Sequence, residues 1–454
     1  MSAMIRFGKR YFVAVALVLA SWAWPGEALA GGPGPEIAAA SGGASQAGAP
    51  PIVEQLENLL SENPELEDWL KQSLEEAKQA NPDQHTNPAQ SLEAYFEYVA
   101  EAAKMLPQDI LDNPSDLIRD QILQTICYFY FLVDQPVKDI SGQGLFKNAI
   151  QYVPEFSDWL RDFANAWGDY LDTPESFTDA TYEQFYDDPN FRLQTGDYEP
   201  RSNWNTFNRF FSRYLASPEK RPIAGKDDDS VVVSPADSVP QGVWPIDENS
   251  DIEVEGGNGL RVKNVRHFSV NDLLGPDLVE YHDIFAKGVL THTFLNVYDY
   301  HRYHFAVGGI VEGVASVQQN VALEVSWDAD GKKYVPIDST GWQFTQTRGI
   351  VIVNTEGGYG RVALIPMGMA QVSSVNFEDD VEIGRTVEKG DMLGTFLFGG
   401  SDFIMLFQEQ AGFEIQAPTT GQGRSLVNGS KGALGQPAYA HILMGTRYGQ
   451  MKGD

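Results

Sequence analysis

Residues 349–365 have the sequence GIVIVNTEGGYGRVALI, and this stretch decides the fold of the larger part of the chain. Two runs of β-branched and aliphatic residues, at 349–353 and 361–365, flank a segment rich in glycine, which favours turns. Similar short runs recur between turn residues, so the pattern predicts a mostly β domain over residues 191–454. Within it, residues 387–391, VEKGD, predict a tight hairpin between two strands, as in compact barrel-like β domains.

The preceding part, residues 51–190, has its apolar residues at helical spacing. Ser91 stands where a helix N-cap belongs, and a continuous apolar run at 122–133 carries Cys127 in what we expect to be a buried helix. Residues 31–190 hold about 29 acidic and about seven basic side chains. We therefore expect an α+β protein in which an acidic N-terminal helical domain precedes the barrel-like β domain.

The first 50 residues are typical of an exported protein. Residues 1–30 begin with basic side chains, continue in an apolar run at 11–24 and end in Ala28-Leu29-Ala30, as a cleaved signal peptide does. An uncleaved membrane anchor is the alternative, but the apolar run is shorter than the roughly 20 residues that span a bilayer. Residues 31–50 are rich in Gly, Ala, Ser and Pro and predict a flexible linker. The sequence thus predicts a periplasmic or secreted protein.

Composition excludes several classes of function. The chain has 454 residues and a formal net charge of -31, whereas binding nucleic acid requires a basic surface. Attraction to anionic lipid by charge is disfavoured for the same reason. The single cysteine excludes an internal disulfide and multi-cysteine metal sites. No metal site is predicted from His292, His301 and His304, because no His-Glu-x-x-His pattern or second ligand pair accompanies them.

Four short motifs could carry chemistry, although each alone has an ordinary structural explanation as a docking helix, a capped turn or a glycine turn. They are residues 207–213 (FNRFFSR), 234–237 (SPAD), 299–304 (DYHRYH) and 398–401 (FGGS). Together they place an acid, a histidine and a serine at the ends of strands in one β domain. These are the ingredients of an activated hydroxyl nucleophile, because histidine supplies a base near neutral pH and the carboxylate fixes its tautomer.

Taken in order, the four motifs resemble those of the phosphatidylserine decarboxylase family. The resemblance covers residues from about 204 to 415, nearly half of the chain, and leaves the helical domain outside it. A helical extension before the core, together with Gly399-Gly400-Ser401, is more similar to the soluble branch of that family, which includes fungal tryptophan decarboxylases.

The resemblance implies that Asp237, His304 and Ser401 form a self-cleavage triad. Ser401 would attack the carbonyl of Gly400, and the resulting ester would eliminate and hydrolyse to leave a covalent pyruvoyl group at the new N-terminus. One precursor would thus yield two chains, divided between residues 400 and 401. The pyruvoyl group would replace pyridoxal phosphate as the electron sink, and His301 or His304 would protonate the carbon that loses CO2.

The sequence departs from the family pattern at three places. Asp402 stands where Ser or Thr is usual, Phe305-Ala306 where proline follows the second histidine, and Ser238 where glycine follows the acid. The departure at Asp402 matters most, because a carboxylate beside the pyruvoyl position could slow cleavage or change the preferred charge of the substrate. None of the departures removes a member of the implied triad.

The resemblance implies a carboxy-lyase that converts phosphatidylserine to phosphatidylethanolamine, with peripheral contact to a membrane. One alternative is a soluble decarboxylase of a free L-amino acid, including an aromatic one, which the acidic helical extension and the lack of a basic amphipathic helix favour. Another is an inactive exported β domain that serves as a binding or scaffold protein. A serine hydrolase is disfavoured because the chain lacks Gly-x-Ser-x-Gly around Ser401.

Overall fold

The computed structural model describes residues 52–107, 118–138, 140, 148–252, 269–336, 345–369, 375–420 and 437–453. The expected export signal and linker, residues 1–30 and 31–50, lie outside this part of the chain. Within it, no helix combines the length and the apolar character that crossing a bilayer requires.

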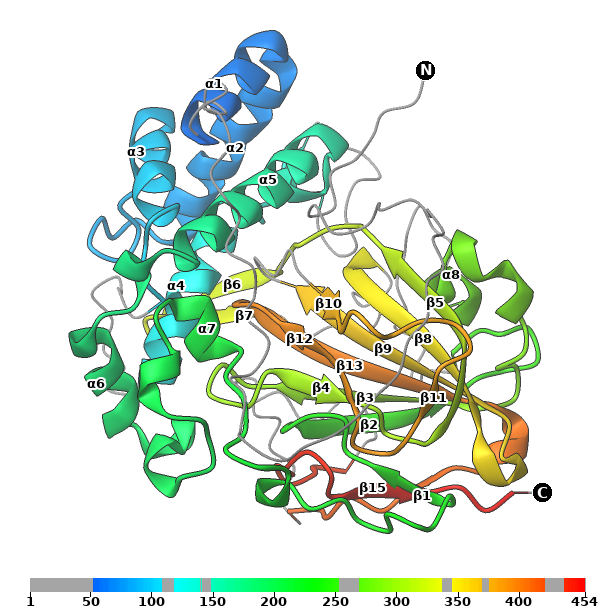
Figure 1. Cartoon of the computed structure of the whole chain (residues 1–454). Helices are drawn as coiled ribbons and strands as arrows, with labels where there is room; N and C mark the ends of the chain where they lie inside the picture. Colours follow the sequence, from blue (N-terminus) through cyan, green and yellow to red (C-terminus); the bar gives the residue numbers. More distant parts are fainter. Residues whose placement is uncertain are drawn as a thin grey trace, which may run out of the picture. The chain divides into compact units, whose positions relative to one another are not determined.

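Helices make up the first half of the described chain (Figure 1). They are α1 (Ile52–Glu62), α2 (Pro64–Ala80), α3 (Leu92–Ala102), α4 (Ile118–Phe131), α5 (Pro154–Leu171), α6 (Asp179–Asp187), α7 (Phe207–Phe211) and, within the β part, α8 (Val270–Leu274). The predicted cap of α3 is present, because the Ser91 hydroxyl accepts a hydrogen bond from the Ala94 N–H at 3.2 Å. Pro64 opens α2 at a position where its missing N–H costs nothing. The predicted buried helix around Cys127 is α4, whose cysteine is fully buried.

Fifteen strands follow among the residues that the structure describes. They are β1 (Val231–Val233), β2 (Val239–Pro245), β3 (Val289–Leu295), β4 (Arg302–His304), β5 (Gly309–Val317), β6 (Val325–Asp328), β7 (Lys333–Pro336), β8 (Thr347–Thr355), β9 (Arg361–Met369), β10 (Val375–Phe377), β11 (Thr386–Val387), β12 (Met392–Phe396), β13 (Gly400–Phe407), β14 (Glu414–Ile415) and β15 (Arg447–Gln450). The quoted stretch at 349–365 forms most of the antiparallel pair β8 and β9.

The described strands form four sheets, and the predicted α+β class is confirmed. The largest sheet has seven antiparallel strands in the order β11-β5-β8-β9-β13-β3-β2. Three-stranded sheets have the orders β10-β12-β4 and β1-β15-β14, and β6 pairs with β7. The order of the large sheet starts at β11 and ends at β2, so within the described residues it is an open sheet rather than a closed barrel.

The large sheet has an apolar core on each face, because successive side chains of a strand point to opposite sides. Along β13, Phe403, Met405 and Phe407 join one core, which includes residues of β4, β12 and β15. Ile404 and Leu406 join the other, which includes α8. The strand that begins at Gly400 is therefore buried on both faces and bonded along both edges.

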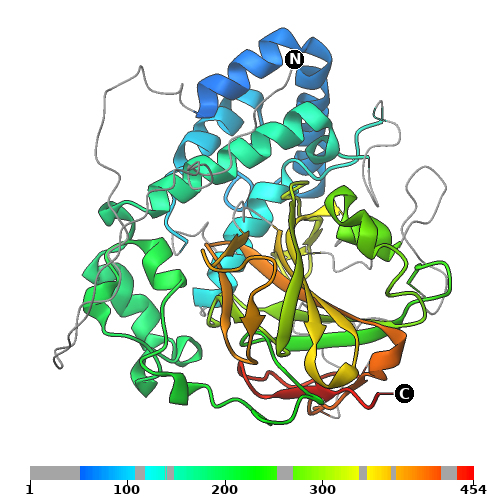
Figure 2. The same cartoon turned by 45° about the vertical axis from the view of Figure 1, so that its right-hand side comes forward.

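The helical part and the β part share a third core. Gln124 of α4 exchanges two hydrogen bonds with the backbone of Tyr334 in β7, at 2.6 and 2.7 Å. Figures 1 and 2 show α4 in cyan beside the β6–β7 hairpin. The described helices and sheets, from residue 52 onward, thus pack as one unit.

The predicted hairpin at 387–391 is wrong in its pairing. The turn itself is present: the Asp391 N–H donates to the Glu388 carbonyl at 3.1 Å, and Gly390 has a φ of +88° that favours glycine. However, β11 before the turn pairs with β5, whereas β12 after it pairs with β4 and β10. The turn therefore joins two sheets, and it places the Gly390 carbonyl close to His304.

Candidate active site

Ser401 lies on β13, in the interior of the seven-stranded sheet. Its backbone pairs with Leu295 of β3 and Gly368 of β9. The side chain is 0% exposed, and its Oγ has no hydrogen-bond partner among the described residues. A buried hydroxyl without a partner loses its hydration without compensation, so its retention calls for a chemical explanation.

The chain enters β13 through a conformation reserved for glycine. Gly399 has a φ of +145°, a region closed to residues with a Cβ, whereas Gly400 already belongs to the strand. The positive φ thus lies one residue before Gly400, whose carbonyl Ser401 would attack. The Gly400–Ser401 peptide thus begins where a constrained turn meets a rigid strand.

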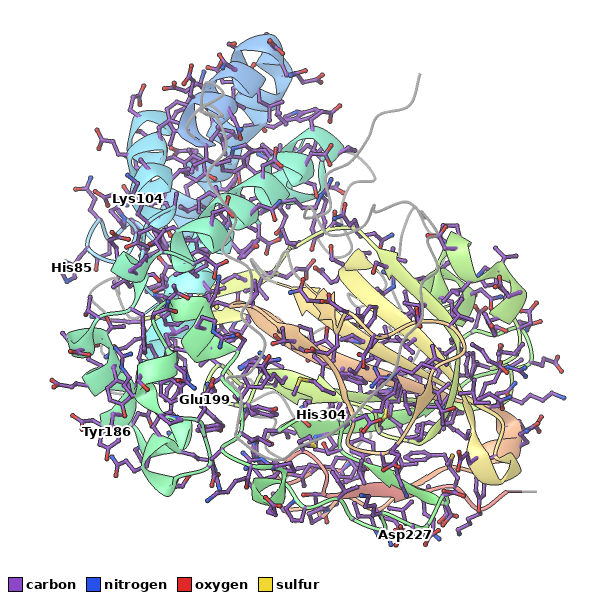
Figure 3. All side chains as sticks on the ribbon, in the orientation of Figure 1. His85, Lys104, Tyr186, Glu199, Asp227 and His304 are labelled. Atoms are coloured by element: carbon purple, nitrogen blue, oxygen red, sulfur yellow. The ribbon has the colours of Figure 1, made fainter. Side chains whose placement is uncertain are left out.

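His304, on β4, is held in one tautomer by its two neighbours. Its Nδ1 lies 2.8 Å from the Gly390 carbonyl, which can only accept, so Nδ1 carries the proton. Nε2 then has a lone pair, and the Tyr300 hydroxyl lies 3.2 Å from it as the donor. Burial lowers the pKa of His304 to about 4, so the imidazole is neutral at physiological pH. Figure 3 labels His304 within the β part of the chain.

His301 is also a buried neutral base. Its Nδ1 lies 2.9 Å from the Asp299 carbonyl, and its ring stacks on Phe211 of α7 with centroids 3.8 Å apart. Burial and the Arg213 charge hold the pKa of His301 well below its ordinary value. Its Nε2 has no partner among the described residues. In this tautomer Nε2 carries a lone pair, so His301 is prepared to accept a proton.

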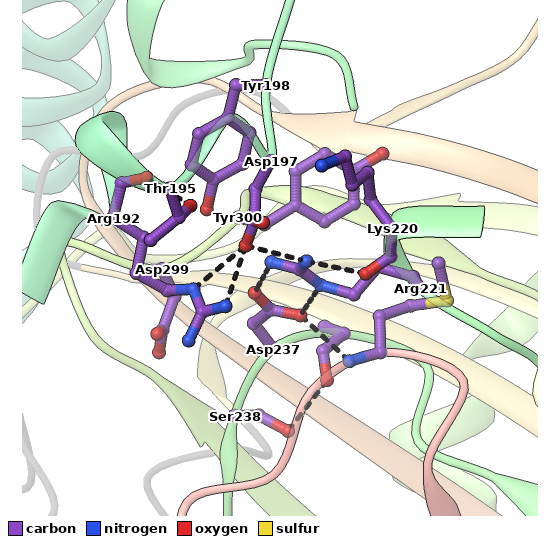
Figure 4. A network of polar contacts seen from close by, with 12 residues as sticks. Arg192, Thr195, Asp197, Tyr198, Lys220, Arg221, Asp237, Ser238, Asp299 and Tyr300 are labelled. Carbon is purple, nitrogen blue, oxygen red and sulfur yellow. Dashed lines mark hydrogen bonds and ion pairs between the residues drawn. The ribbon is translucent and has the colours of Figure 1, made fainter. Parts of the chain in front are cut away.

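Asp237 is held by Arg221 rather than by His304. Arg221 donates from Nε to Oδ1 at 2.9 Å and from Nη2 to Oδ2 at 2.6 Å, and the Met444 N–H donates to Oδ1 at 2.8 Å (Figure 4). Both side chains of the ion pair are 1% exposed. The link between Asp237 and His304 is through the backbone, because the His304 N–H donates to the Pro235 carbonyl at 2.8 Å.

The structure therefore gathers the implied residues at one end of the large sheet without joining them by side-chain hydrogen bonds. Val239 of β2 and Asp402 of β13 both pair with Phe294 of β3, so the turn before β2 and the start of β13 flank the same end of β3. Among the described residues no hydrogen bond connects Ser401 to His304, or His304 to Asp237.

Asp402 faces away from Ser401. It shares the face of Ile404, whereas Ser401 shares the face of Phe403. Its Oδ1 lies 3.1 Å from Nε2 of His292 on β3, and the Asp402 side chain is 1% exposed. The carboxylate that the sequence places next to Ser401 is thus on the other side of the sheet and has its own partner.

Sequence reasoning missed a second acid-histidine pair beside the site. Nε2 of His441 lies 2.7 Å from Oδ1 of Asp299, the residue that opens the 299–304 segment. Burial would lower the pKa of His441, but the hydrogen bond and charge of Asp299 outweigh it and raise the pKa. No motif surrounds His441, so only the folded chain brings the two residues together. Asp299 itself could have been singled out, because it lies within a recognised motif.

Among the described residues, no three His, Cys, Asp or Glu side chains are grouped as a metal site would require. The polar atoms near the start of β13 are instead a buried hydroxyl and two neutral imidazoles with free or weakly engaged Nε2 atoms. Such a set can remove a proton from a hydroxyl and stabilise the resulting charge.

Comparisons with known proteins identify relatives of the part of the chain that carries this site. The family model for phosphatidylserine decarboxylase matches residues 207–432. The phosphatidylserine decarboxylase proenzyme 2 of Oryza sativa is 31% identical over 256 residues, which are 56% of this chain and 37% of that protein. The phosphatidylserine decarboxylase proenzyme of Chlamydia trachomatis is 30% identical over 46% of this chain and 62% of its own.

A third relative matches over more of its length. The decarboxylase iboD of Amanita muscaria is 25% identical over 302 residues, which are 60% of this chain and 81% of that protein. The chain thus spans 37% of the rice relative and 62% of the chlamydial one, but most of the fungal decarboxylase.

Proposed function

This chain belongs to the phosphatidylserine decarboxylase family, and from that membership we propose that it is a pyruvoyl-dependent decarboxylase that cleaves itself between Gly400 and Ser401. The observation that carries the proposal is the Ser401 hydroxyl, which is fully buried and has no partner among the described residues. Ser401 stands two residues after Gly399, whose φ of +145° favours glycine. A reacting hydroxyl fits this environment better than a structural one does.

In the proposed self-cleavage, Ser401 Oγ bonds to the Gly400 carbonyl carbon while the peptide C–N bond breaks, and the hydroxyl proton passes by way of a base to the freed nitrogen. We assign the base to His304, whose neutral Nε2 is available if the Tyr300 hydroxyl turns aside. Asp237 would act through its charge, which favours the protonated form of His304 and opposes the larger effect of burial. Arg221 holds that charge in place.

The residues at the start of β13 also fit a pyruvoyl group formed from Ser401. Such a group supplies an electrophilic ketone that takes up a substrate amine and serves as the electron sink when the carboxylate leaves. His301 would hold the proton that replaces the carboxylate. Because burial keeps the free imidazole neutral, its Nε2 would first accept the proton that the substrate's ammonium group gives up when the amine reacts. Apolar surroundings would favour loss of a charged carboxylate as neutral CO2.

We propose phosphatidylserine as the substrate and phosphatidylethanolamine as the product. Support comes from the family and from two relatives named as phosphatidylserine decarboxylase proenzymes. The export signal expected at residues 1–30 would give such an enzyme access to a membrane face.

A free L-amino acid is the second candidate. The match to a decarboxylase over 81% of its length, against 37% of the rice proenzyme, favours this alternative. Burial adds to it, because Ser401 and His301 are 0% exposed and α7 packs over His301. A small substrate reaches such a site more readily than a lipid held in a bilayer.

Intact-mass spectrometry of the purified protein tests the self-cleavage. The parent should give two chains that separate between residues 400 and 401, with the smaller chain blocked by a carbonyl that borohydride reduces. Ser401→Ala should remain one chain without activity, whereas Ser73→Ala, which alters another fully buried serine in α2, should be cut like the parent. A single unbroken parent chain would leave the scaffold alternative in place.

The substrate is tested separately by measuring CO2 released from phosphatidylserine vesicles and from a panel of free amino acids. Release from the vesicles alone supports the lipid, and release from one amino acid alone supports the second candidate. A cleaved protein that releases CO2 from neither contradicts both substrate proposals.

A further inference from the structure

The ring of Phe398, three residues before Ser401, is enclosed by three other aromatic rings. Trp167 lies 5.3 Å from it at an interplanar angle of 89°, Phe207 at 5.3 Å and 83°, and Phe211 at 5.1 Å and 72°. All three contacts have the edge-to-face geometry that aromatic pairs prefer. Phe398 is 4% exposed, so the four rings form a closed cluster.

The partners of Phe398 are themselves fixed. Trp167 lies on α5, and its indole N–H donates to the Met105 carbonyl at 2.7 Å. Phe207 and Phe211 lie on α7, which is joined to α5 by a hydrogen bond from the Asn208 side chain to the Gly168 carbonyl at 3.1 Å. Trp167 stands outside residues 207–432, the part that matches the family model.

The Gly400–Ser401 peptide therefore lies at the start of a fixed strand, just after a short segment whose other end, Phe398, is also fixed. On one side Phe398 is held by rings of α5 and α7, and on the other β13 is bonded to β3 and β9 from its first residues. Only Gly399 separates Phe398 from Gly400, the first residue of β13, and Gly399 has the φ of +145°. Residues with rigid neighbours on both sides have few orientations available, so the ring of Phe398 limits where the Gly400 carbonyl can point.

We propose that Trp167, Phe207 and Phe211 form an aromatic clamp on Phe398 that positions the Gly400 carbonyl for attack by Ser401. The helical part of the chain would then contribute a positioning residue, Trp167, to self-cleavage. The clamp also connects the cleavage site to the buried base His301, because Phe211 contacts Phe398 and also stacks on His301. This inference rests on the proposed self-cleavage.

Trp159 provides a matched control for Trp167. Both residues lie on α5, are 3–4% exposed and donate their indole N–H to a backbone carbonyl, Trp159 to Ile52 at 3.1 Å. The rings near Trp159 are Phe156 and Phe163, and it has no ring contact with Phe398. Trp167→Leu and Trp159→Leu thus remove similar packing and one hydrogen bond each, but only the first opens the clamp.

The rate of self-cleavage is measured in the full chain by cell-free synthesis, a chase and denaturing electrophoresis, with thermal melting of each variant in a Ser401→Ala background. We expect Trp167→Leu to slow cleavage about tenfold, because losing the energy of one edge-to-face contact from the transition state corresponds to a change in rate of about that size. Trp159→Leu should cleave at the parent rate although it melts at a similarly lowered temperature. Trp167→Phe, which keeps a ring against Phe398, should recover most of the rate.

The outcomes separate the two proposals. If the parent chain stays whole, the proposed function fails and the clamp has nothing to position. If the parent is cut and the two leucine variants are cut equally fast, or slowed equally, the clamp is refuted while self-cleavage stands. Should Trp167→Leu not fold, Phe398→Leu opens the clamp from the other side, and an unchanged cleavage rate in a folded Phe398→Leu chain would also refute it.

Discussion

Lowering the pH from about 8 to about 5.5 should leave the proposed base His304 neutral. With the pKa lowered by burial to about 4, about 97% of His304 would be neutral at pH 5.5. A histidine with the ordinary pKa of about 6.5 would be only about 9% neutral at that pH. Self-cleavage should therefore persist in mildly acidic conditions if His304 is the base.

The same burial links His304 to stability. Its pKa in the folded chain is below that in the unfolded chain, so between about pH 6.5 and 4 the folded chain binds fewer protons, and stability falls as the pH falls through this window. At about pH 5.5 the resulting loss of stability is roughly a tenfold change in the unfolding equilibrium. His304→Gln should remove this part of the acid sensitivity.

Histidine-selective carbon-13 NMR of the uncut Ser401→Ala chain measures the titration directly. His304→Gln assigns its signal, which should not shift between about pH 8 and 5.5. His441 provides the contrast in the same spectra, because its hydrogen bond to Asp299 raises its pKa and it should titrate above the ordinary value. A His304 signal with a midpoint near 6.5 would refute the argument that burial keeps this base neutral.

Two further predictions concern polar pairs around the site. His292→Leu should destabilise the Ser401→Ala chain by about 1–3 kcal/mol in urea unfolding, because it removes the polar neighbour of the buried Asp402 side chain, and adding Asp402→Asn should restore most of the loss. Unchanged stability in the single variant would contradict this pairing. Arg221→Lys keeps the charge but cannot reproduce both hydrogen bonds to Asp237, so a loss of about 1.5–3 kcal/mol is expected in the same assay, and a parent-like unfolding midpoint would contradict it.

Local patterns in the sequence predicted the features that depend on local chemistry. The cap at Ser91 and the buried helix around Cys127 each follow from residues within a few positions. The turn at 388–391 was predicted for the same reason. Its pairing was not, because the partners of β11 and β12 are strands that lie far away in the chain.

The environment of the site depended on contacts that no local pattern contains. Asp402 was expected to influence Ser401 because the two are adjacent in sequence, but adjacency in a strand places them on opposite faces. Its partner His292 comes from another strand, and the partner of Asp299 comes from near the C-terminus. The motifs identified the residue types, whereas the tautomer of His304 depends on Gly390 and Tyr300, which only folding brings into contact.

The position of β13 between β3 and β9 affects how long the cleaved protein stays folded. If the chain is cut where this strand begins, the fragment that starts at residue 401 remains hydrogen-bonded to the sheet along both edges of β13, and its β15 also pairs with β1. The peptide bond that held β13 next to the rest of the sheet during folding would be gone. Once unfolded, the two chains would have to associate again from solution. The cleaved protein would therefore stay folded because it unfolds slowly and not because it refolds readily.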